Sequence, residues 1–200
     1  MDDNTHAYDA QSDAVERMLG TAVSPEDPDR VIIEPWAASV SGPILDVGSG
    51  TGRWTGHLAS LGHDVTGLEP AEGLIRNARD TYPGVEFWHG SIAELRQTET
   101  RWAGMLAWYS IIHMGPAELP GALAILRAAL EPNGTLLMSF FSGFHLESFA
   151  HPVTTAYRWP MADMTDLLND AGFEVTTHHW EPPAPHAYVI ACPTTSEKPR

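Results

Sequence analysis

Residues 44–53 read ILDVGSGTGR, a short, mostly apolar run that leads straight into three alternating glycines. A run of this length is too short and too continuous for an amphipathic helix, and it is typical of a buried strand in a parallel sheet. The glycines allow a sharp turn and a close approach of the backbone to a ligand, because no Cβ stands in the way. Helical spacing resumes at Trp54, Leu58 and Leu61, and Gly62 marks the end of that helix. The stretch therefore predicts a strand, a glycine turn and a helix in direct succession.

The charge beside this turn narrows the choice of ligand. The dinucleotide fingerprint G-x-G-x-x-G/A fails in both registers, because Arg53 and Thr55 stand where a small residue is required. A Walker A loop fails as well, since no lysine occurs before Lys198. Asp46, at the mouth of the turn, would repel a pyrophosphate and attract a cation. S-adenosylmethionine carries an ammonium and a sulfonium, and it is the cofactor that this pattern predicts.

Further strands are expected to end at the same edge of the sheet. Residues 63–70, HDVTGLEP, predict a second strand that ends in the carboxylate of Glu69. In doubly wound sheets an acid at this place accepts hydrogen bonds from the ribose hydroxyls of a nucleoside. A third strand is predicted over 85–89 and a fourth over 105–109. Ligands of such sheets bind outside the carboxyl ends of the strands, so all four ends are expected to converge on one crevice.

Helical and strand patterns alternate along the rest of the chain, which indicates a parallel sheet with crossover helices, a doubly wound α/β fold. Helices are predicted over about 74–82, 122–130 and 161–171, and closing strands over 173–180 and 187–192. The EPPAP connection between the closing strands is stiff and not helical. These two strands are therefore expected to pair antiparallel.

Together these motifs resemble the class I S-adenosylmethionine-dependent methyltransferases, in their small stand-alone form, over residues 30–192. The motifs that carry the likeness follow the order of the family: LDVGSGTG (45–52), GLEP (67–70), GSI (90–92), WYSIIHM (108–114) and LEPNGTLL (130–137). The resemblance implies a Rossmann-like, seven-stranded sheet, mostly parallel, with an antiparallel C-terminal hairpin strand.

The same resemblance implies how the cofactor is held. Asp46 and the glycine turn would bind its methionine part and Glu69 its ribose. Ser91 and Ile92 would contact the adenine, and Trp108 would line the floor of the site. Many relatives have an aspartate in place of Ser91, and in this respect the chain departs from the family. The predicted cofactor-binding residues are Asp46, Gly48, Ser49, Gly50, Gly52, Arg53, Trp54, Glu69, Pro70, Ser91, Ile92 and Trp108.

Two residues of that set have alternative interpretations. Arg53 opposes the dipole of the helix that it begins, which favours an anionic partner such as the cofactor carboxylate or an acidic substrate. A solvated arginine is the other interpretation. Trp54 either caps the pocket or fills the core, and a contact with the substrate is a further alternative.

Methyl transfer requires few catalytic groups from the protein. Methyl transfer is an in-line displacement, so orientation and desolvation of the nucleophile are the main contributions. His113, just beyond the fourth strand, is the candidate general base, and a structural histidine is the alternative. Tyr109 either positions a substrate through its hydroxyl or packs against the cofactor. Substrate contacts are expected from Tyr8, His113, Tyr157 and Arg158, the last for a carboxylate or phosphate.

Length and composition predict one domain. The 200 residues, 43% of them hydrophobic, are enough for one core and few for two. Residues 1–30 are expected to form a helical cap or lid, with a peripheral helix as the alternative, 31–192 the Rossmann-like core, and 193–200 a mobile tail. Cys192 is the single cysteine, and neither a signal peptide nor an 18-residue apolar span is visible. These features predict a reducing, cytoplasmic setting without a membrane.

Charge and histidine content exclude some partners. The formal net charge of -15 repels phosphate backbones, and ordinary solubility is the alternative explanation of the charge itself. None of the ten histidines forms an i, i+4 pair of the kind found on zinc-binding helices, so no metal site is predicted. A small-molecule methyl acceptor is the expected partner, and both a monomer and a homodimer remain open.

Four functions remain for comparison. The first hypothesis is a methyltransferase that modifies a small organic molecule at oxygen, nitrogen or carbon. An RNA or other macromolecule methyltransferase is the second, and a non-catalytic S-adenosylmethionine-binding protein is the third. A nicotinamide oxidoreductase is the fourth. The Asn/Asp-Pro-Pro-aromatic motif of amino-directed DNA methyltransferases is absent after the fourth strand, where the chain reads WYSI.

Overall fold

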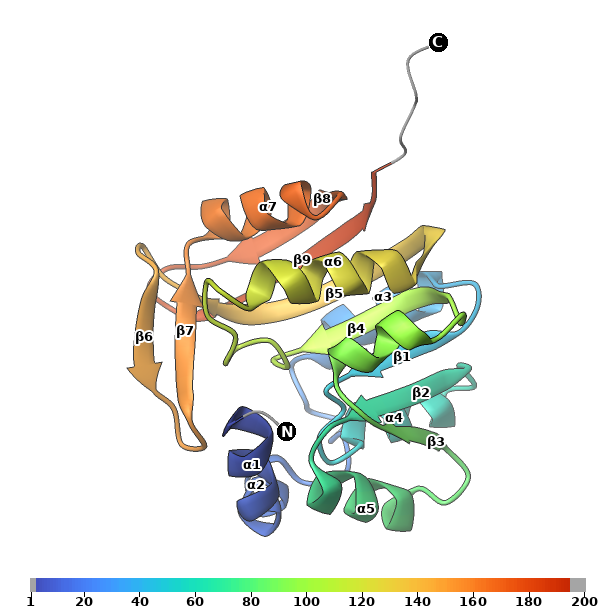
Figure 1. The fold of residues 1–200 in the computed structure, drawn as a ribbon. Helices are drawn as coiled ribbons and strands as arrows, with labels where there is room; N and C mark the ends of the chain where they lie inside the picture. Colours follow the sequence, from blue (N-terminus) through green and yellow to red (C-terminus); the bar gives the residue numbers. More distant parts are fainter. Residues whose placement is uncertain (1–2, 195–200) are drawn as a thin grey trace.

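The computed structural model describes residues 3–194, which form a single mixed sheet with helices on both faces (Figure 1). Over these residues the sheet has nine strands, in the order β3-β2-β1-β4-β5-β7-β6, and β9 pairs with both β5 and β8. The strands are β1 (Ile44–Val47), β2 (Val65–Glu69), β3 (Glu86–His89), β4 (Trp102–Trp108), β5 (Leu130–Ser142), β6 (Glu147–Ala150), β7 (Thr155–Trp159), β8 (Phe173–Trp180) and β9 (His186–Pro193).

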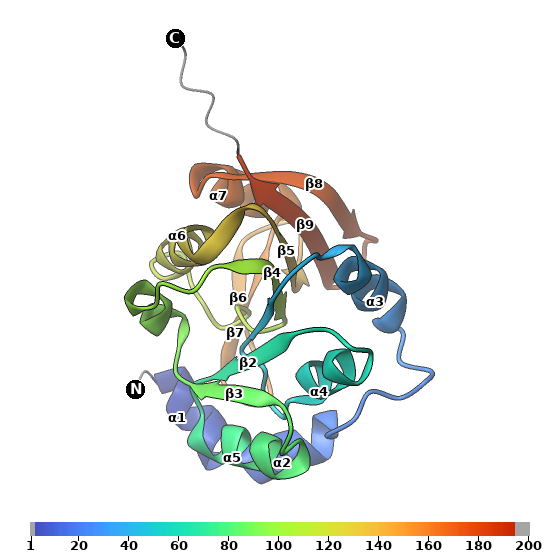
Figure 2. The ribbon, with the colours of Figure 1, turned by 90° about the vertical axis from the view of Figure 1, so that its right-hand side faces the viewer.

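The helices connect these strands and cover the sheet. They are α1 (Asp3–Ala10), α2 (Ser12–Leu19), α3 (Arg30–Ser39), α4 (Arg53–Ser60), α5 (Glu72–Thr81), the 3-10 helix η1 (Ile92–Gln97), α6 (Leu119–Ala129) and α7 (Met161–Asp170). Figure 2 shows α3 and α4 on one face of the sheet and α6 and α7 on the other. The N-terminal helices α1 and α2 pack against α5.

The strand sequences explain why both faces are covered. β1, β2 and β4 lie in the middle of the sheet and pair in parallel. Neighbouring residues on a strand point to opposite faces. Ile44 and Leu106 accordingly pack in the core cluster of α3 and α4, whereas Leu45 and Met105 pack in the cluster of α6 and α7. A strand buried on both faces appears in the sequence as a continuous apolar run, which is the pattern that predicted β1.

The predicted fold class is confirmed, including the antiparallel pairing of β8 with β9. The number of strands differs from the seven expected, because the segment after β5, for which no strand was predicted, contains the hairpin of β6 and β7. β7 extends the sheet by pairing in parallel with the end of β5, where Phe141 lies opposite Arg158. Burial of Ala156 and Trp159 and a hydrogen bond from Ser142 Oγ to the Trp159 carbonyl oxygen (2.9 Å) hold it there. The hairpin thus brings Thr155 and His151 to the carboxyl end of the sheet.

Candidate active site

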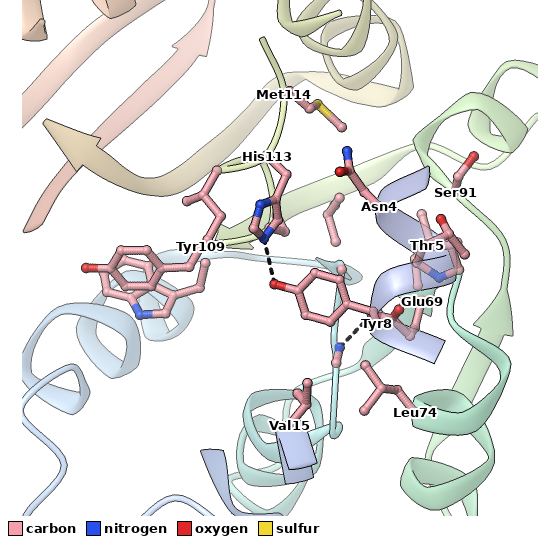
Figure 3. A pocket seen from close by; sticks show the side chains of 18 of the residues that line it. Asn4, Thr5, Tyr8, Val15, Glu69, Leu74, Ser91, Tyr109, His113 and Met114 are labelled. Carbon is pink, nitrogen blue, oxygen red and sulfur yellow. Dashed lines mark hydrogen bonds between the residues drawn. The ribbon is translucent and has the colours of Figure 1, made fainter. Parts of the chain in front are cut away.

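A cavity of about 430 Å³ lies at the carboxyl ends of the central strands (Figure 3). Residues from the ends of β1, β2, β3 and β4 line it, as the sequence predicted, together with residues of α1 and α2. The predicted site residues that line it are Tyr8, Gly48, Gly50, Glu69, Pro70, Ser91, Ile92, Trp108, Tyr109 and His113. The convergence of four strand ends on one cavity is the geometry that doubly wound sheets use to bind nucleosides.

The glycine turn adopts a backbone that other residues rarely take. Gly48, Gly50 and Gly52 have φ values of 67°, 57° and 75°. A Cβ on Gly48 would lie 2.5 Å from the Cβ of Ser110, whereas a Cβ on Gly50 would meet nothing within 4 Å. The turn is therefore packed against the end of β4 at Gly48 and open at Gly50. This arrangement leaves room for a ligand to contact the backbone of the turn.

Glu69 ends β2 next to this turn, and both of its carboxylate oxygens are already held. Gly50 N donates to Oε2 and Ala71 N donates to Oε1, each at 2.8 Å. The pKa of Glu69 is raised to about 7, because burial, with a smaller effect of the Asp46 charge, outweighs the lowering by the hydrogen bonds from Ala71 and Gly50. Each oxygen keeps a second lone pair, so the carboxyl can still accept hydrogen bonds from the hydroxyls of a ribose.

Asp46 does not lie where the sequence placed it. Its side chain is 3% exposed and does not line the cavity. Thr55 Oγ1 donates to Asp46 Oδ2 at 2.6 Å, and burial raises the pKa of Asp46 to about 6. Asp46 therefore lies behind the turn, where its hydrogen bond with Thr55 links the end of β1 to α4. Ser49 and Gly52 also lie outside the lining.

Arg53 and Trp54 begin α4, and neither lines the cavity. Arg53 Nη2 forms an ion pair with Asp27 Oδ2 at 2.7 Å, and Nη1 donates to the Leu19 carbonyl oxygen at 3.1 Å. The anionic partner that its position favoured is thus a side chain of the same protein. Trp54 is buried in the core cluster of α3 and α4, which matches the core-filling interpretation.

Ser91 and Ile92 line the cavity at the start of η1. Ser91 Oγ accepts from Ala93 N at 3.2 Å and donates to Glu94 Oε2 at 2.5 Å, and Ser91 N donates to the same oxygen. This capping box uses the hydroxyl proton of Ser91. Ser91 therefore acts as the N-cap of η1.

The end of β4 carries two aromatic residues into the cavity. Trp108 is tied through Nε1 to Asp29 Oδ2 at 2.8 Å. Tyr109 has a φ of 56°, which is rare for a residue other than glycine, and its N–H donates to Ser139 Oγ at 2.8 Å. The Tyr109 hydroxyl lies 2.8 Å from His186 Nδ1. A strained residue held by its neighbours is a frequent feature of functional sites.

Both ring nitrogens of His113 are within hydrogen-bond distance of a partner. Its Nδ1 lies 2.8 Å from the Thr155 carbonyl oxygen, and its Nε2 lies 2.8 Å from the Tyr8 hydroxyl (Figure 3). Burial lowers the pKa of His113, the Thr155 contact raises it, and His151 lowers it again. The net direction is downward, so His113 is neutral at neutral pH and available as a base. The sequence placed Tyr8 among the substrate contacts, but it gave no signal that Tyr8 or Thr155 pairs with His113.

Tyr157 and Arg158 lie on β7, outside this cavity. Arg158 forms an ion pair with Glu147 at 2.8 Å and covers the ring of Phe149 at 4.3 Å. Tyr157 lines a second, polar cavity of about 410 Å³, which shares Asn4 and His113 with the first. The predicted pairing of Arg158 with a substrate anion in the main cavity is not part of this geometry.

Two findings concern other kinds of site. Within residues 3–194, no group of three or more histidine, cysteine, aspartate or glutamate side chains is arranged to hold a metal ion. Among the same residues, no helix is both long and apolar enough to cross a bilayer.

The fold and the cavity define a Rossmann-like α/β protein with a nucleoside site at the carboxyl ends of its strands. Residues 44–134 match the family described as "Methyltransferase domain". An uncharacterized methyltransferase of Alkaliphilus oremlandii is 30% identical over 98 residues, which are 49% of this chain and 45% of that protein. The chain thus covers less than half of the length of that relative.

Solved structures share the whole architecture. The CcbJ methyltransferase of Streptomyces caelestis has a TM-score of 0.78 at 19% identity, with 97% of this chain and 100% of that chain covered. The 1,6-didemethyltoxoflavin-N1-methyltransferase of Burkholderia thailandensis has a TM-score of 0.72 at 23% identity, with 98% and 92% covered. The latter is described with 1,6-didemethyltoxoflavin and S-adenosylhomocysteine bound. The chain therefore shares the fold of these methyltransferases, and its residues 44–134 match a methyltransferase family.

Proposed function

We propose that this protein transfers the methyl group of S-adenosylmethionine to a small organic molecule. The observation that carries the proposal is the pairing of Glu69 with the open glycine turn at Gly50, inside a cavity built by four strand ends. When bound, S-adenosylmethionine supplies a methyl group on a positively charged sulfur, and the electron pair of the broken bond stays with that sulfur.

The described residues fit this cofactor. Glu69 would hold the ribose, Ser91 and Ile92 the adenine side, and the glycine turn the methionine part. Ser110 Oγ also lies at the cavity, buried and without a hydrogen-bond partner among the described residues, as a polar atom that a ligand can satisfy. Val47, Leu68 and Leu74 supply the apolar lining that excludes water.

His113 is the general base of this proposal. Its pKa is lowered, it lines the cavity, and its Nε2 is directed toward Tyr8 and the interior. Tyr109 contributes by orienting the wall around the acceptor. Holding the acceptor in line and removing its proton are what this chain adds to the chemistry.

A small acceptor is favoured over a nucleic acid. None of the described residues that line the cavity is a lysine or arginine, and the net charge is -15. Such a surface repels a phosphate backbone. The Burkholderia neighbour is described with a small organic molecule bound, which supports the same choice. A cytoplasmic location belongs to this proposal, supported by the single cysteine.

The test is to incubate the protein with methyl-labelled S-adenosylmethionine and an extract of its own cells, and to identify the species that gains the label. A labelled small molecule is the expected result. Label in RNA, together with RNA binding that weakens strongly as the salt concentration rises, would show that the acceptor is RNA and not a small molecule. Tight cofactor binding without any label would favour the non-catalytic binding protein.

A further inference from the structure

We propose that Tyr8 is a proton relay between the methyl acceptor and His113, and that the acceptor is an uncharged planar aromatic molecule with a proton on its reacting oxygen or nitrogen. This inference rests on the proposed function and deepens it. It assigns a chemical role to a side chain of α1 and narrows the class of acceptor.

The tautomer of His113 follows from its two partners. A carbonyl oxygen only accepts hydrogen bonds, so the 2.8 Å contact with the Thr155 oxygen requires the proton of neutral His113 to be on Nδ1. The Nε2 atom then carries a lone pair, and the Tyr8 hydroxyl at 2.8 Å donates to it. The Tyr8 hydroxyl therefore donates a hydrogen bond to Nε2 of His113, and Nδ1–H of His113 donates one to the carbonyl oxygen of Thr155.

Tyr8 stands between His113 and the space of the cavity. It reaches from α1 across the cavity toward His113, and its ring meets the imidazole edge to face with centroids 5.4 Å apart (Figure 3). A hydroxyl that donates one hydrogen bond still has lone pairs with which to accept another. An acceptor in the cavity can therefore hydrogen-bond to the Tyr8 oxygen while Tyr8 remains bound to Nε2.

The ionisation of Tyr8 alone is unfavourable. Burial raises the pKa of its hydroxyl well above the ordinary value, and the charge of Glu69 raises it further. A free tyrosinate is thus not a stable intermediate in this cavity. Proton transfer to Tyr8 must coincide with proton transfer from Tyr8 to His113.

The lining of the cavity selects the charge of the acceptor. Among the described residues that line it there is neither a lysine nor an arginine, so an anionic acceptor would find no permanent cation. Glu69 is the single carboxylate of that lining; both of its oxygens accept backbone N–H groups, and in the proposed function the ribose of the cofactor takes their remaining lone pairs. A cationic acceptor would therefore find no free carboxylate, and an uncharged acceptor fits best.

The wall near His113 selects the shape of the acceptor. Phe141 and His151 line the cavity beside Tyr109 and His186, with ring centroids 5.3 to 6.2 Å apart. His151 packs against His113 at 5.1 Å, and burial lowers the pKa of His151, which favours its neutral form. Flat neutral rings pack against such a wall through offset or edge contacts.

The proton balance of the step is complete. As the reacting oxygen or nitrogen forms its bond to the methyl carbon, its proton passes to the Tyr8 oxygen and the Tyr8 proton passes to Nε2. Tyr8 ends as a neutral phenol and His113 as an imidazolium that still donates to Thr155. The positive charge lost at sulfur appears on His113. Exposed Glu118, in the second cavity that His113 also lines, gives the proton a polar route back to water.

The test uses Tyr8→Phe, His113→Gln and the double variant, with Tyr188→Phe as a matched loss of a hydroxyl outside both cavities. Three quantities are measured: the initial rate of label transfer into the cell extract, the Kd of S-adenosylhomocysteine by calorimetry, and the pKa of His113 by NMR titration. Tyr8→Phe keeps the ring, so the Kd is expected to stay within about twofold.

The relay predicts that Tyr8→Phe slows label transfer by about 100-fold, the usual size of a general acid–base contribution. The double variant is expected to be no slower than the slower single variant, because the two groups act as one unit. The pKa of His113 is expected to rise, since Tyr8 stabilises the neutral imidazole. Tyr188→Phe is expected to keep the wild-type rate, and the labelled product to be an aromatic O-methyl or N-methyl compound.

Two results would overturn the relay while the proposed function stands: a Tyr8→Phe rate within about threefold of wild type, or losses that multiply in the double variant. A labelled aliphatic or charged product would overturn the acceptor class. A wild-type protein that binds no S-adenosylhomocysteine would overturn the proposed function, and the relay with it. Calorimetry on the wild-type protein therefore separates the two failures.

Discussion

Replacing Glu69 by glutamine should change the way in which stability depends on pH. Glu69 is 5% exposed, and burial raises its pKa from 4.5 to about 7. At a pH between these two pKa values, Glu69 is protonated in the folded protein and deprotonated in the unfolded chain. Stability from this group is therefore fully present below pH 4.5 and is lost as the pH rises through about 7.

The size of the effect follows from the same values. A pKa raised from 4.5 to about 7 corresponds to roughly 3 kcal/mol over the full range, at about 1.4 kcal/mol for each unit of pKa. Between pH 5.5 and 8 the expected loss is about 2 kcal/mol. Asp46, His89 and Tyr8 interact electrostatically with Glu69, but they remain in both proteins and largely cancel in the comparison.

The assay is urea unfolding of the wild type and of Glu69→Gln at several pH values, with the free energy of unfolding compared at each. Glutamine offers one oxygen to the two N–H groups of Gly50 and Ala71, so the variant also carries a constant penalty of about 1–3 kcal/mol. The wild type is expected to lose about 2 kcal/mol relative to the variant from pH 5.5 to 8. Glu72→Gln, which removes an exposed carboxylate of α5, is the control and should follow the wild type. If the difference in the free energy of unfolding between the wild type and Glu69→Gln did not change with pH, the reasoning would be refuted.

Three further substitutions test the site. Gly48→Ala should weaken S-adenosylhomocysteine binding about tenfold or more, measured by calorimetry, because φ of 67° costs a side chain about 1–2 kcal/mol and the new Cβ would lie 2.5 Å from Ser110. Gly121→Ala, with nothing within 4 Å, is the control and should bind normally. His113→Gln should slow label transfer about 100-fold with unchanged cofactor affinity, and an unchanged rate would remove it from the mechanism. Arg158→Gln should alter neither rate nor affinity, and a large loss of rate would return it to the acceptor site.

The parts of the fold that were predictable from sequence are those set by local patterns. The run at Ile44 to Val47 is apolar because β1 is buried on both faces, and the glycines after it adopt the positive φ values that only glycine takes easily. The position of Glu69 at a strand end beside the turn followed from the same spacing. The β6–β7 hairpin was not predictable in this way, because exposed β6 shows no alternation of apolar and polar residues.

The parts of the site that the sequence did not predict depend on contacts between segments that are distant in the sequence. Tyr8 and His113 are 105 positions apart, and their pairing exists because α1 packs over the carboxyl ends of the strands. The partner of Arg53 is Asp27, supplied by a connection without periodicity. Asp46 was expected at the mouth of the turn, but its bond to Thr55 directs it behind the turn. Sequence spacing places a residue on an element, whereas the direction of its side chain depends on packing that spacing does not encode.

The most direct measurement of the central claim is a calorimetric titration of the protein with S-adenosylhomocysteine and, separately, with NAD. The cavity around Glu69 and the glycine turn predicts binding of S-adenosylhomocysteine, one molecule per chain, and no binding of NAD. Heat of binding with NAD and none with S-adenosylhomocysteine would contradict the account.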